Sequence, residues 1–540
     1  MTFVALAGVL LLAIVAGLVA LGVKAWRGRD QQGDDSGIDL IPYLLLALAV
    51  GVAGFSLASL ARASLTPDRL AGRPTGAIAG ALAGLVVATP VAFLLWRRQA
   101  KRRRTHPPAA GWPIYLAIVE LTFLTAFLFA VAQLAEALTG EGATADWPDL
   151  VVYGGIVAFH WWSERSDPPR ADIGDLPRLV GSGVALIALT TGLIGTLTWL
   201  LSEVYDSLWG PSSVQDPAVP LALTLVAAPI WAWRWLPAWD DDPNAFRNFY
   251  LGFVTASALI MTIAAGVTLI ATLLAFLFTD VGSSQQHFRL YPTALAFVIV
   301  GEAIWFHHRR RLGPGRTGAV RGYEYAMAAT GLGTLIGSAT GLVDTVFRPN
   351  LAGTNTAERL IGLGCLVIAS GSVWLWFWRK AQAAPRAAEI GALPRRIYLI
   401  GMAIVTGLTA AGSLIAALVV VFRSFLGEVG ATGDSLRIPV TLAIIAGLAT
   451  WHLFTHIRQD GTLLTRTEVK PFTVTVICSH PGNLTSLLAE EARVRVLYRG
   501  DSVGNIDDAM AAAIVAEVGG DSSIVWVDEG EFRTAPAREP

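Results

Sequence analysis

The sequence predicts an all-α polytopic membrane protein with about thirteen transmembrane helices and a small C-terminal α/β cytoplasmic module. Of its 540 residues, 54% are hydrophobic and only 15% are charged, whereas soluble domains carry about 25% charged residues. The charges are missing from long runs, such as 248–279 and 397–422, and about 20 apolar residues are enough to cross a bilayer. Aromatic and basic residues also recur together at regular intervals. A soluble enzyme is therefore excluded for most of the chain.

Thirteen runs are uncharged or nearly so, and each predicts one span. They lie near 2–23, 40–61, 76–96, 113–138, 149–162, 179–202, 217–233, 249–278, 288–306, 325–343, 360–378, 397–422 and 438–457. The fifth run is short for a bilayer and suits a tilted, thinned or partly re-entrant segment. We divide the chain into an N-terminal anchor helix (1–26), a transmembrane domain of helical hairpins (38–460) and a cytoplasmic acidic α/β module (470–532).

The distribution of basic residues predicts the orientation. The first run has no basic residue before its apolar stretch, unlike a cleaved signal peptide, so it is expected to remain as an anchor helix. One set of connecting loops carries 24 Lys and Arg residues and the alternate set carries 8. Positive loops stay in the cytoplasm. The N-terminus is therefore expected outside and the C-terminus inside.

Clusters of aromatic and basic residues close the second helix of each hairpin and predict an internal repeat. The tryptophans that mark them are Trp96, Trp161, Trp233, Trp305, Trp376 and Trp451, separated by 65, 72, 72, 71 and 75 residues. Tyrosines open most of the partner helices, at Tyr43, Tyr115, Tyr250, Tyr323 and Tyr398. An interfacial aromatic belt explains the residue types but not the period. We expect six parallel two-helix repeats related by an axis along the membrane normal, since each crosses the membrane twice.

These features resemble a known family. The Arg-x-Tyr-type opening, the Gly/Ala-rich first helix and the Trp-Arg ending look like bacterial transmembrane modules of domain of unknown function 5671, which recur in tandem. The resemblance extends over about 40–457, although Leu179 stands where one unit should have tyrosine. It implies no established activity and no catalytic residues. Glycines of the spans, among them Gly192, Gly195, Gly266, Gly331, Gly333 and Gly412, are expected at close helix contacts.

From Lys470 the pattern changes to a βαβαβ module. Strands are predicted at 472–479, 494–498 and 523–527, and helices at 483–491 and 506–518. Residues 471–540 carry a net charge of −6. The loop 479–483 leads into a helix whose N-terminus could hold an anion, or it is a capping loop. Asp507 and Asp508 fit a helix start that complements the dipole.

Several kinds of site are excluded or disfavoured. No Gly-Lys-Ser/Thr triplet exists, so there is no P-loop. Two lone cysteines, Cys365 and Cys478, cannot build a four-ligand zinc or iron–sulfur site by themselves. His452 and His456 are four residues apart and share a helix face, which would suit a metal or haem; interface-seeking histidines explain the same placement. No cofactor and no nucleic-acid partner is predicted.

Ionisable residues within spans are the remaining candidates, because burying a charge in a bilayer is costly. Glu302 lies four residues before Phe306, near the end of its span, and can reach water or the following arginines. Glu120 lies about 12 Å into its helix, counted from Trp112. It is expected to face the protein interior, with a partner on another helix such as a Ser or Thr hydroxyl. The alternative is a structural hydrogen bond between helices.

Two functions remain open. The first is a bacterial plasma-membrane protein that binds or moves a small solute or ion within its bundle. The second is an accessory subunit that docks other membrane proteins and recruits a cytoplasmic partner through its acidic module. An enzyme is not expected, because no nucleophile–base motif is present. No motif in the sequence identifies the solute, the partner or the energy coupling.

Overall fold

A computed structural model gives the fold. It describes residues 40–65, 75–105, 111–139, 147–169, 174–209, 216–236, 245–279, 283–313, 315, 317–347, 356–384, 389–427, 433–467, 473–478, 484, 493–498, 506–518, 523–528 and 531–536. The predicted anchor helix and the loop 479–483 lie outside these residues, as does the helix 483–491 apart from Leu484.

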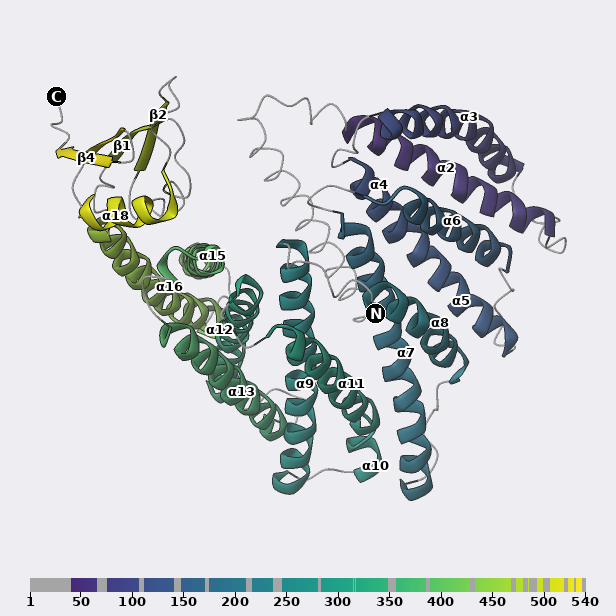
Figure 1. Cartoon of the computed structure of the whole chain (residues 1–540). Helices are drawn as coiled ribbons and strands as arrows, with labels where there is room; N and C mark the ends of the chain where they lie inside the picture. Colours follow the sequence, from purple (N-terminus) through teal and green to yellow (C-terminus); the bar gives the residue numbers. More distant parts are fainter. Residues whose placement is uncertain are drawn as a thin grey trace. The chain divides into compact units, whose positions relative to one another are not determined.

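In the described membrane domain, five consecutive helical hairpins are followed by two long helices, α15 and α16 (Figure 1). The first hairpin is α2 (Leu40–Leu65) with α3 (Thr75–Thr105). In the second, α4 (Gly111–Val119), the π-helical turn η2 (Glu120–Leu124) and α5 (Thr125–Leu138) follow one another directly and pair with α6 (Trp147–Ser166). The third is α7 (Leu176–Trp209) with α8 (Ala218–Trp235). The next two are α9 (Ala245–Phe278) with α10 (Ser284–His287) and α11 (Tyr291–Arg311), and α12 (Gly318–Phe347) with α13 (Thr356–Gln382). The remaining helices of this domain are α15 (Leu393–Phe425) and α16 (Gly433–Thr467).

Among the described residues, eleven helices are long and apolar enough to cross a membrane, and they coincide with eleven of the thirteen predicted runs. The fold is therefore that of an all-α polytopic membrane protein. The predicted run 149–162 is a helix, α6, but it is not one of the eleven. It is 20 residues long and contains Asp149, His160 and Glu164, which leaves too little apolar length. The run 2–23 is outside the described residues.

The chain divides into two compact units, 1–398 with 405–447 and 399–404 with 448–540. In the first unit, neighbouring hairpins among the first five pack against one another in sequence order. The span Gly111–Leu138 is the most enclosed, with 56% of its apolar window buried against 39% or less in the others. Its hydrophobic core is centred on Trp112, Tyr115 and Phe123. Among the described spans, Gly111–Leu138 is therefore the one most covered by protein.

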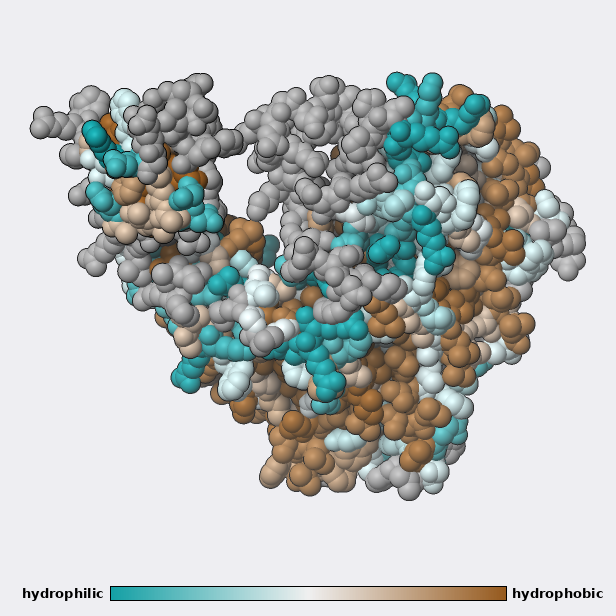
Figure 2. All heavy atoms as spheres, viewed as in Figure 1, coloured by the Kyte–Doolittle hydropathy of each residue, from teal (hydrophilic) through white to brown (hydrophobic). Residues whose placement is uncertain are grey.

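The outer sides of the helices are apolar (Figure 2). Leu48 on α2, Val86 on α3, Ile368 on α13 and Leu408 on α15 are each 65–71% exposed. Exposed apolar side chains on helices of this length are accommodated by lipid. The protein is therefore a membrane protein whose helices contact the bilayer.

Tyrosine–tryptophan pairs join successive hairpins. Trp305 donates its indole N–H to the Tyr323 hydroxyl at 3.2 Å, and Trp374 donates to Tyr398 at 3.3 Å. The rings of Trp235 and Tyr250 lie 4.8 Å apart at the corresponding junction. Trp305 and Tyr323, both markers of the sequence pattern, thus contact each other, whereas at the other two junctions the tryptophan lies two residues from the marker, at Trp374 and Trp235.

The expectation for the glycines is correct in part. A Cβ at Gly192, Gly195 or Gly331 would lie 2.7 Å or less from an atom of the neighbouring helix, so these positions allow close helix approach. At Gly266, Gly333 and Gly412 the expectation was wrong, because no atom of a described residue lies within 4 Å of a Cβ there. Composition does not distinguish a glycine on the packed side of a helix from one on the open side.

The C-terminal module contains a four-stranded sheet in the order β2-β1-β3-β4. Its strands are β1 (Thr473–Cys478), β2 (Arg493–Tyr498), β3 (Ser523–Asp528) and β4 (Glu531–Pro536), and the helix is α18 (Asp508–Val518). β1 is parallel to β2 and β3, as predicted, and β4 pairs antiparallel with β3. β4 was not predicted, since its sequence is polar and ends in proline, which edge strands tolerate. Ala511 and Ile514 of α18 pack on Val474, Val476 and Val525.

Candidate functional site

The candidate site starts from Glu120, the first residue of the π-helical turn η2. Its side chain is buried, at 2% exposure, inside the most enclosed span. A π-turn contains one extra residue within a helix and is frequent at functional sites. Here the π-turn begins at the carboxylate-bearing residue of an apolar span. Because the side chain of Glu120 is buried, it faces protein and not lipid.

The partner of Glu120 is Arg234, near the C-terminal end of α8. An Nη of Arg234 donates directly to the Glu120 carboxylate, and its other Nη donates to Glu164 Oε2 at 2.7 Å. All three side chains are buried, each with 6% exposure or less. The partner expected from the sequence was a Ser or Thr hydroxyl on another helix, so this prediction was wrong. Arg234 instead turns inward between two carboxylates that lie 44 residues apart in the chain (120 and 164).

Two further residues shape this cluster. The Trp161 indole N–H donates to Glu120 Oε1 at 3.1 Å, and the Arg234 guanidinium lies 5.8 Å from the Trp161 ring. Gly181 of α7 lies directly against the carboxylate, because a Cβ there would be 1.8 Å from Glu120 Oε2. Only glycine fits at 181 while Glu120 keeps this position.

The cluster continues toward the surface through Arg178. Its Nε lies 3.7 Å from Glu164 Oε1, and its side chain is 42% exposed. The order from surface to interior is therefore Arg178, Glu164, Arg234, Glu120, with alternating charges. We call these four residues the charge chain.

Three buried atoms of the charge chain have no hydrogen-bond partner among the described residues. They are Glu120 Oε2, Glu164 Oε1 and Arg234 Nε. Glu120 Oε2 and Arg234 Nε both border Gly181, at 1.8 and 3.2 Å from the position of a Cβ. Buried polar atoms without partners are uncommon in native structures. Each of the two carboxylates of the charge chain therefore has one oxygen that could accept a further hydrogen bond or contact a cation.

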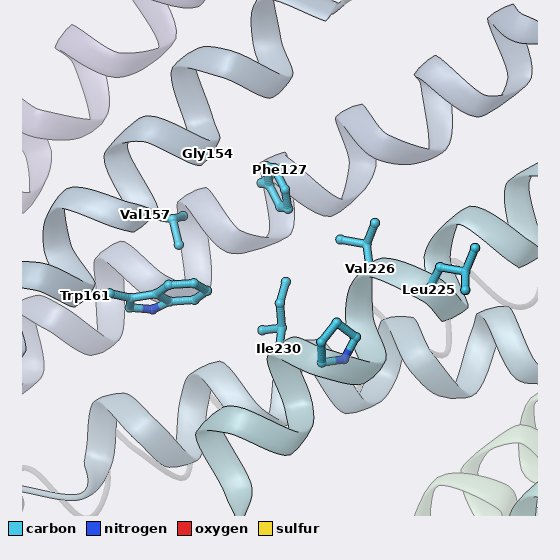
Figure 3. A pocket seen from close by; sticks show the side chains of 8 residues that line it. Phe127, Gly154, Val157, Trp161, Leu225, Val226 and Ile230 are labelled. Atoms are coloured by element: carbon cyan, nitrogen blue, oxygen red, sulfur yellow. The ribbon is translucent and has the colours of Figure 1, made fainter.

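A pocket of about 380 Å³ lies beside Trp161, between α5, α6 and α8 (Figure 3). Its lining consists of Phe127, Gly154, Val157, Trp161, Leu225, Val226, Pro229 and Ile230. Trp161 thus separates the pocket from Glu120, to which its N–H is bonded.

The other predicted residues lie elsewhere. Glu302 is exposed on α11, with no ion pair to a described residue, and is not brought to the charge chain. His452 and His456 lie on α16 with ring centroids 4.8 Å apart. Among the described residues, no group of three His, Cys, Asp or Glu side chains could hold a metal.

A second buried polar cluster lies at the junction of α12, α13 and α15. Glu389, which is 1% exposed, accepts from Arg321 Nε at 2.8 Å and from the Tyr325 hydroxyl at 3.0 Å. Arg395 donates to the Tyr325 hydroxyl at 3.4 Å and to Gln382 Oε1 at 3.2 Å. Unlike the charge chain, this cluster has both oxygens of its carboxylate occupied.

Sequence reasoning missed Arg234, Glu164, Trp161 and Gly181 as site residues. Trp161 and Arg234 fall in the aromatic–basic ends of helices, where an interfacial role accounts for both residue types, and Glu164 lies beside one of these clusters. The one available signal was that Glu120 has no charged neighbour on its own helix face, so a partner from another span was required.

Two overlapping parts of the chain, 248–371 and 321–448, match the family described as Domain of unknown function (DUF5671). Together the two matches cover residues 248–448, which we call the DUF5671 region. No curated protein and no solved structure matches the chain. The DUF5671 region contains the hairpins from α9 onward and the Glu389 cluster, whereas the charge chain and the pocket precede it. The family therefore assigns no role to the charge chain.

Proposed function

We propose that this protein binds and moves a small cation, with the proton as the simplest case, through the charge chain in its helical bundle. The observation that carries the proposal is the pair of buried carboxylates, Glu120 and Glu164, on either side of Arg234, each with one oxygen free of hydrogen bonds among the described residues. Ionisable groups inside membrane domains are expensive and mark ion and proton pathways.

The chemistry favours a cation over an anion. Arginine stays protonated in proteins, so only the two carboxylates can gain or lose a proton. Their free atoms are mainly acceptors, which suit a proton or a metal cation. Arg178, which is 42% exposed, begins a route from the surface to the buried end of the chain.

The test is ion flux in proteoliposomes that contain the purified full-length protein and a pH-sensitive dye. A K⁺ gradient with valinomycin sets the membrane potential. We expect Glu120→Gln and Glu164→Gln to reduce proton flux by about tenfold or more, because an amide cannot carry the proton. Glu136→Gln is the matched control, since Glu136 is an exposed carboxylate on the same span, in α5.

A purely structural role for the charge chain predicts a different result. Glu120→Gln would then keep wild-type flux, because glutamine retains the shape and the acceptor oxygen. Wild-type protein without flux of H⁺, Na⁺ or K⁺ would overturn the proposal. Stoichiometric co-purification of another membrane subunit with inactive protein would favour the accessory role.

We further propose that the protein resides in a bacterial plasma membrane with its N-terminus outside and its C-terminus in the cytoplasm, and that its hairpins are parallel repeats. The excess of basic residues in alternate loops supports the orientation. The DUF5671 matches begin at residues 248 and 321, an offset of about 73 residues, which supports a repeat of the predicted length. No cofactor is part of the proposal, so the purified protein should show no Soret absorption.

A further inference from the structure

The pocket beside Trp161 has no polar side-chain group available to a ligand. Seven of its lining residues are Phe127, Gly154, Val157, Leu225, Val226, Pro229 and Ile230, none of which has a polar side chain. The eighth, Trp161, directs its N–H to Glu120 at 3.1 Å and presents the ring (Figure 3). Pro229 has no backbone N–H. A ligand that fits this lining is therefore apolar where it is bound.

The mouth of the pocket opens through the side of the bundle. Leu225 is 72% exposed and Pro229 is also exposed, both on the span Ala218–Trp235. Leu225 lies ten residues from Trp235, or about 15 Å along the helix axis. This places the mouth at hydrocarbon depth, where the surrounding medium is lipid.

On the α6 side, the lack of a side chain at Gly154 leaves space in the pocket. A Cβ at Gly154 would lie 3.1 Å from Phe127, while nothing is within 4 Å of a Cβ at Gly155. The pocket volume of about 380 Å³ falls in the range of sites for small ligands, about 300–1,000 Å³.

We infer that this pocket binds one alkyl chain of a bilayer amphiphile, which enters sideways between α5 and α8. The alkyl chain lies against Phe127, Ile230 and the ring of Trp161, while the polar group of the amphiphile remains outside the pocket. The medium at the mouth supplies such chains at high concentration, and the apolar lining gives no specificity for a polar solute. This site is separate from the cation route, although Trp161 contacts both.

The test uses full-length protein in vesicles that contain a phosphatidylcholine with a diazirine in the middle of one acyl chain. After irradiation, mass spectrometry locates the labelled residues. We expect labelling at Phe127, Leu225 and Ile230 that saturates with probe and is competed by unmodified lipid. Gly154→Leu should reduce that labelling at least about fivefold by filling the pocket, while the neighbouring control Gly155→Leu leaves it unchanged.

A second pair of variants covers the case in which Gly154→Leu does not fold. Leu225→Trp places a bulky ring at the mouth and should reduce labelling of Ile230, whereas Leu221→Trp, at a residue that is also exposed on α8, should not. Equal labelling in each variant and its control would overturn the inference. So would labelling that never saturates, as expected for lipid that merely surrounds the protein, or displacement by a small solute such as benzene but not by lipid.

Discussion

At the residue scale, the consequence of burial is clearest at Arg234, which has two carboxylate partners and 4% exposure. Removing one partner from a buried ion pair leaves an uncompensated charge, which costs about 3–5 kcal/mol. Loss of different members of the charge chain should therefore cost different amounts of stability. Loss of Glu120 or of Glu164 leaves Arg234 with one carboxylate partner, whereas loss of Arg234 leaves two carboxylates facing each other.

We therefore expect Arg234→Met to lower the free energy of unfolding by about 3–5 kcal/mol and Glu120→Gln to lower it by about 1 kcal/mol. Glutamine can still accept from Arg234 and Trp161. Thermal unfolding of the purified protein in detergent measures both. A Glu120→Gln variant that is less stable than Arg234→Met would contradict this order.

Gly181 gives a second prediction. Alanine at 181 would force the Glu120 carboxylate to move, because its Cβ would meet Oε2 at 1.8 Å, whereas a Cβ at Gly183 meets Tyr250 at an ordinary 3.7 Å. Overpacking of this kind costs about 1–3 kcal/mol. Gly181→Ala should lower the unfolding temperature and Gly183→Ala should not. Equal effects would mean that the carboxylate moves without cost.

At the element scale, the hairpin junctions and the sheet show how far local pattern reaches. The Trp and Tyr markers lie near the ends of helices, and the structure brings Trp305 and Tyr323 into contact. β1 is recognisable from its alternating valines because one of its faces is buried. Its last residue, Cys478, is part of that core, and burial raises the pKa of its thiol.

The Cys478 thiol should consequently stay protonated and unreactive in the folded module. In a Cys365→Ser variant at pH 8, we expect slow alkylation by iodoacetamide that becomes fast on denaturation. Because the pKa is raised in the folded module, the thiol of the unfolded chain loses its proton at a lower pH than the thiol of the folded module. The module should therefore lose stability above about pH 8.5, the ordinary thiol value. Rapid alkylation of the native protein would show that the thiol is accessible.

At the scale of the whole molecule, the first five hairpins contact their sequence neighbours in order, as in repeat proteins in which each unit packs on the next. The charge chain lies at one such junction, between the second and third hairpins, since Glu120 and Glu164 come from one and Arg178 and Arg234 from the other. A relative movement of these two hairpins would make or break the pairs, as the proposed cation route would require.

The proposed orientation is testable for the complete chain. A fluorescent-protein fusion at Pro540 should fluoresce and an alkaline phosphatase fusion there should be inactive, because the phosphatase folds only in an oxidising compartment. Active phosphatase at Pro540 would place the C-terminus outside and reverse the assignment of the basic loops.

The sequence by itself determined the membrane class, eleven of the thirteen predicted spans and the three parallel strands of the C-terminal module, because hydrophobic runs and strand alternation are local properties of the chain. It also singled out Glu120, since a charge within an apolar run is visible without a structure. Only the tertiary structure decided what Glu120 meets. Arg234 is 114 residues away in the chain and has the sequence environment of an interfacial residue. Its direction depends on the packing of α8 against the second hairpin. Ion pairs between helices depend on which faces meet, and no local pattern records that.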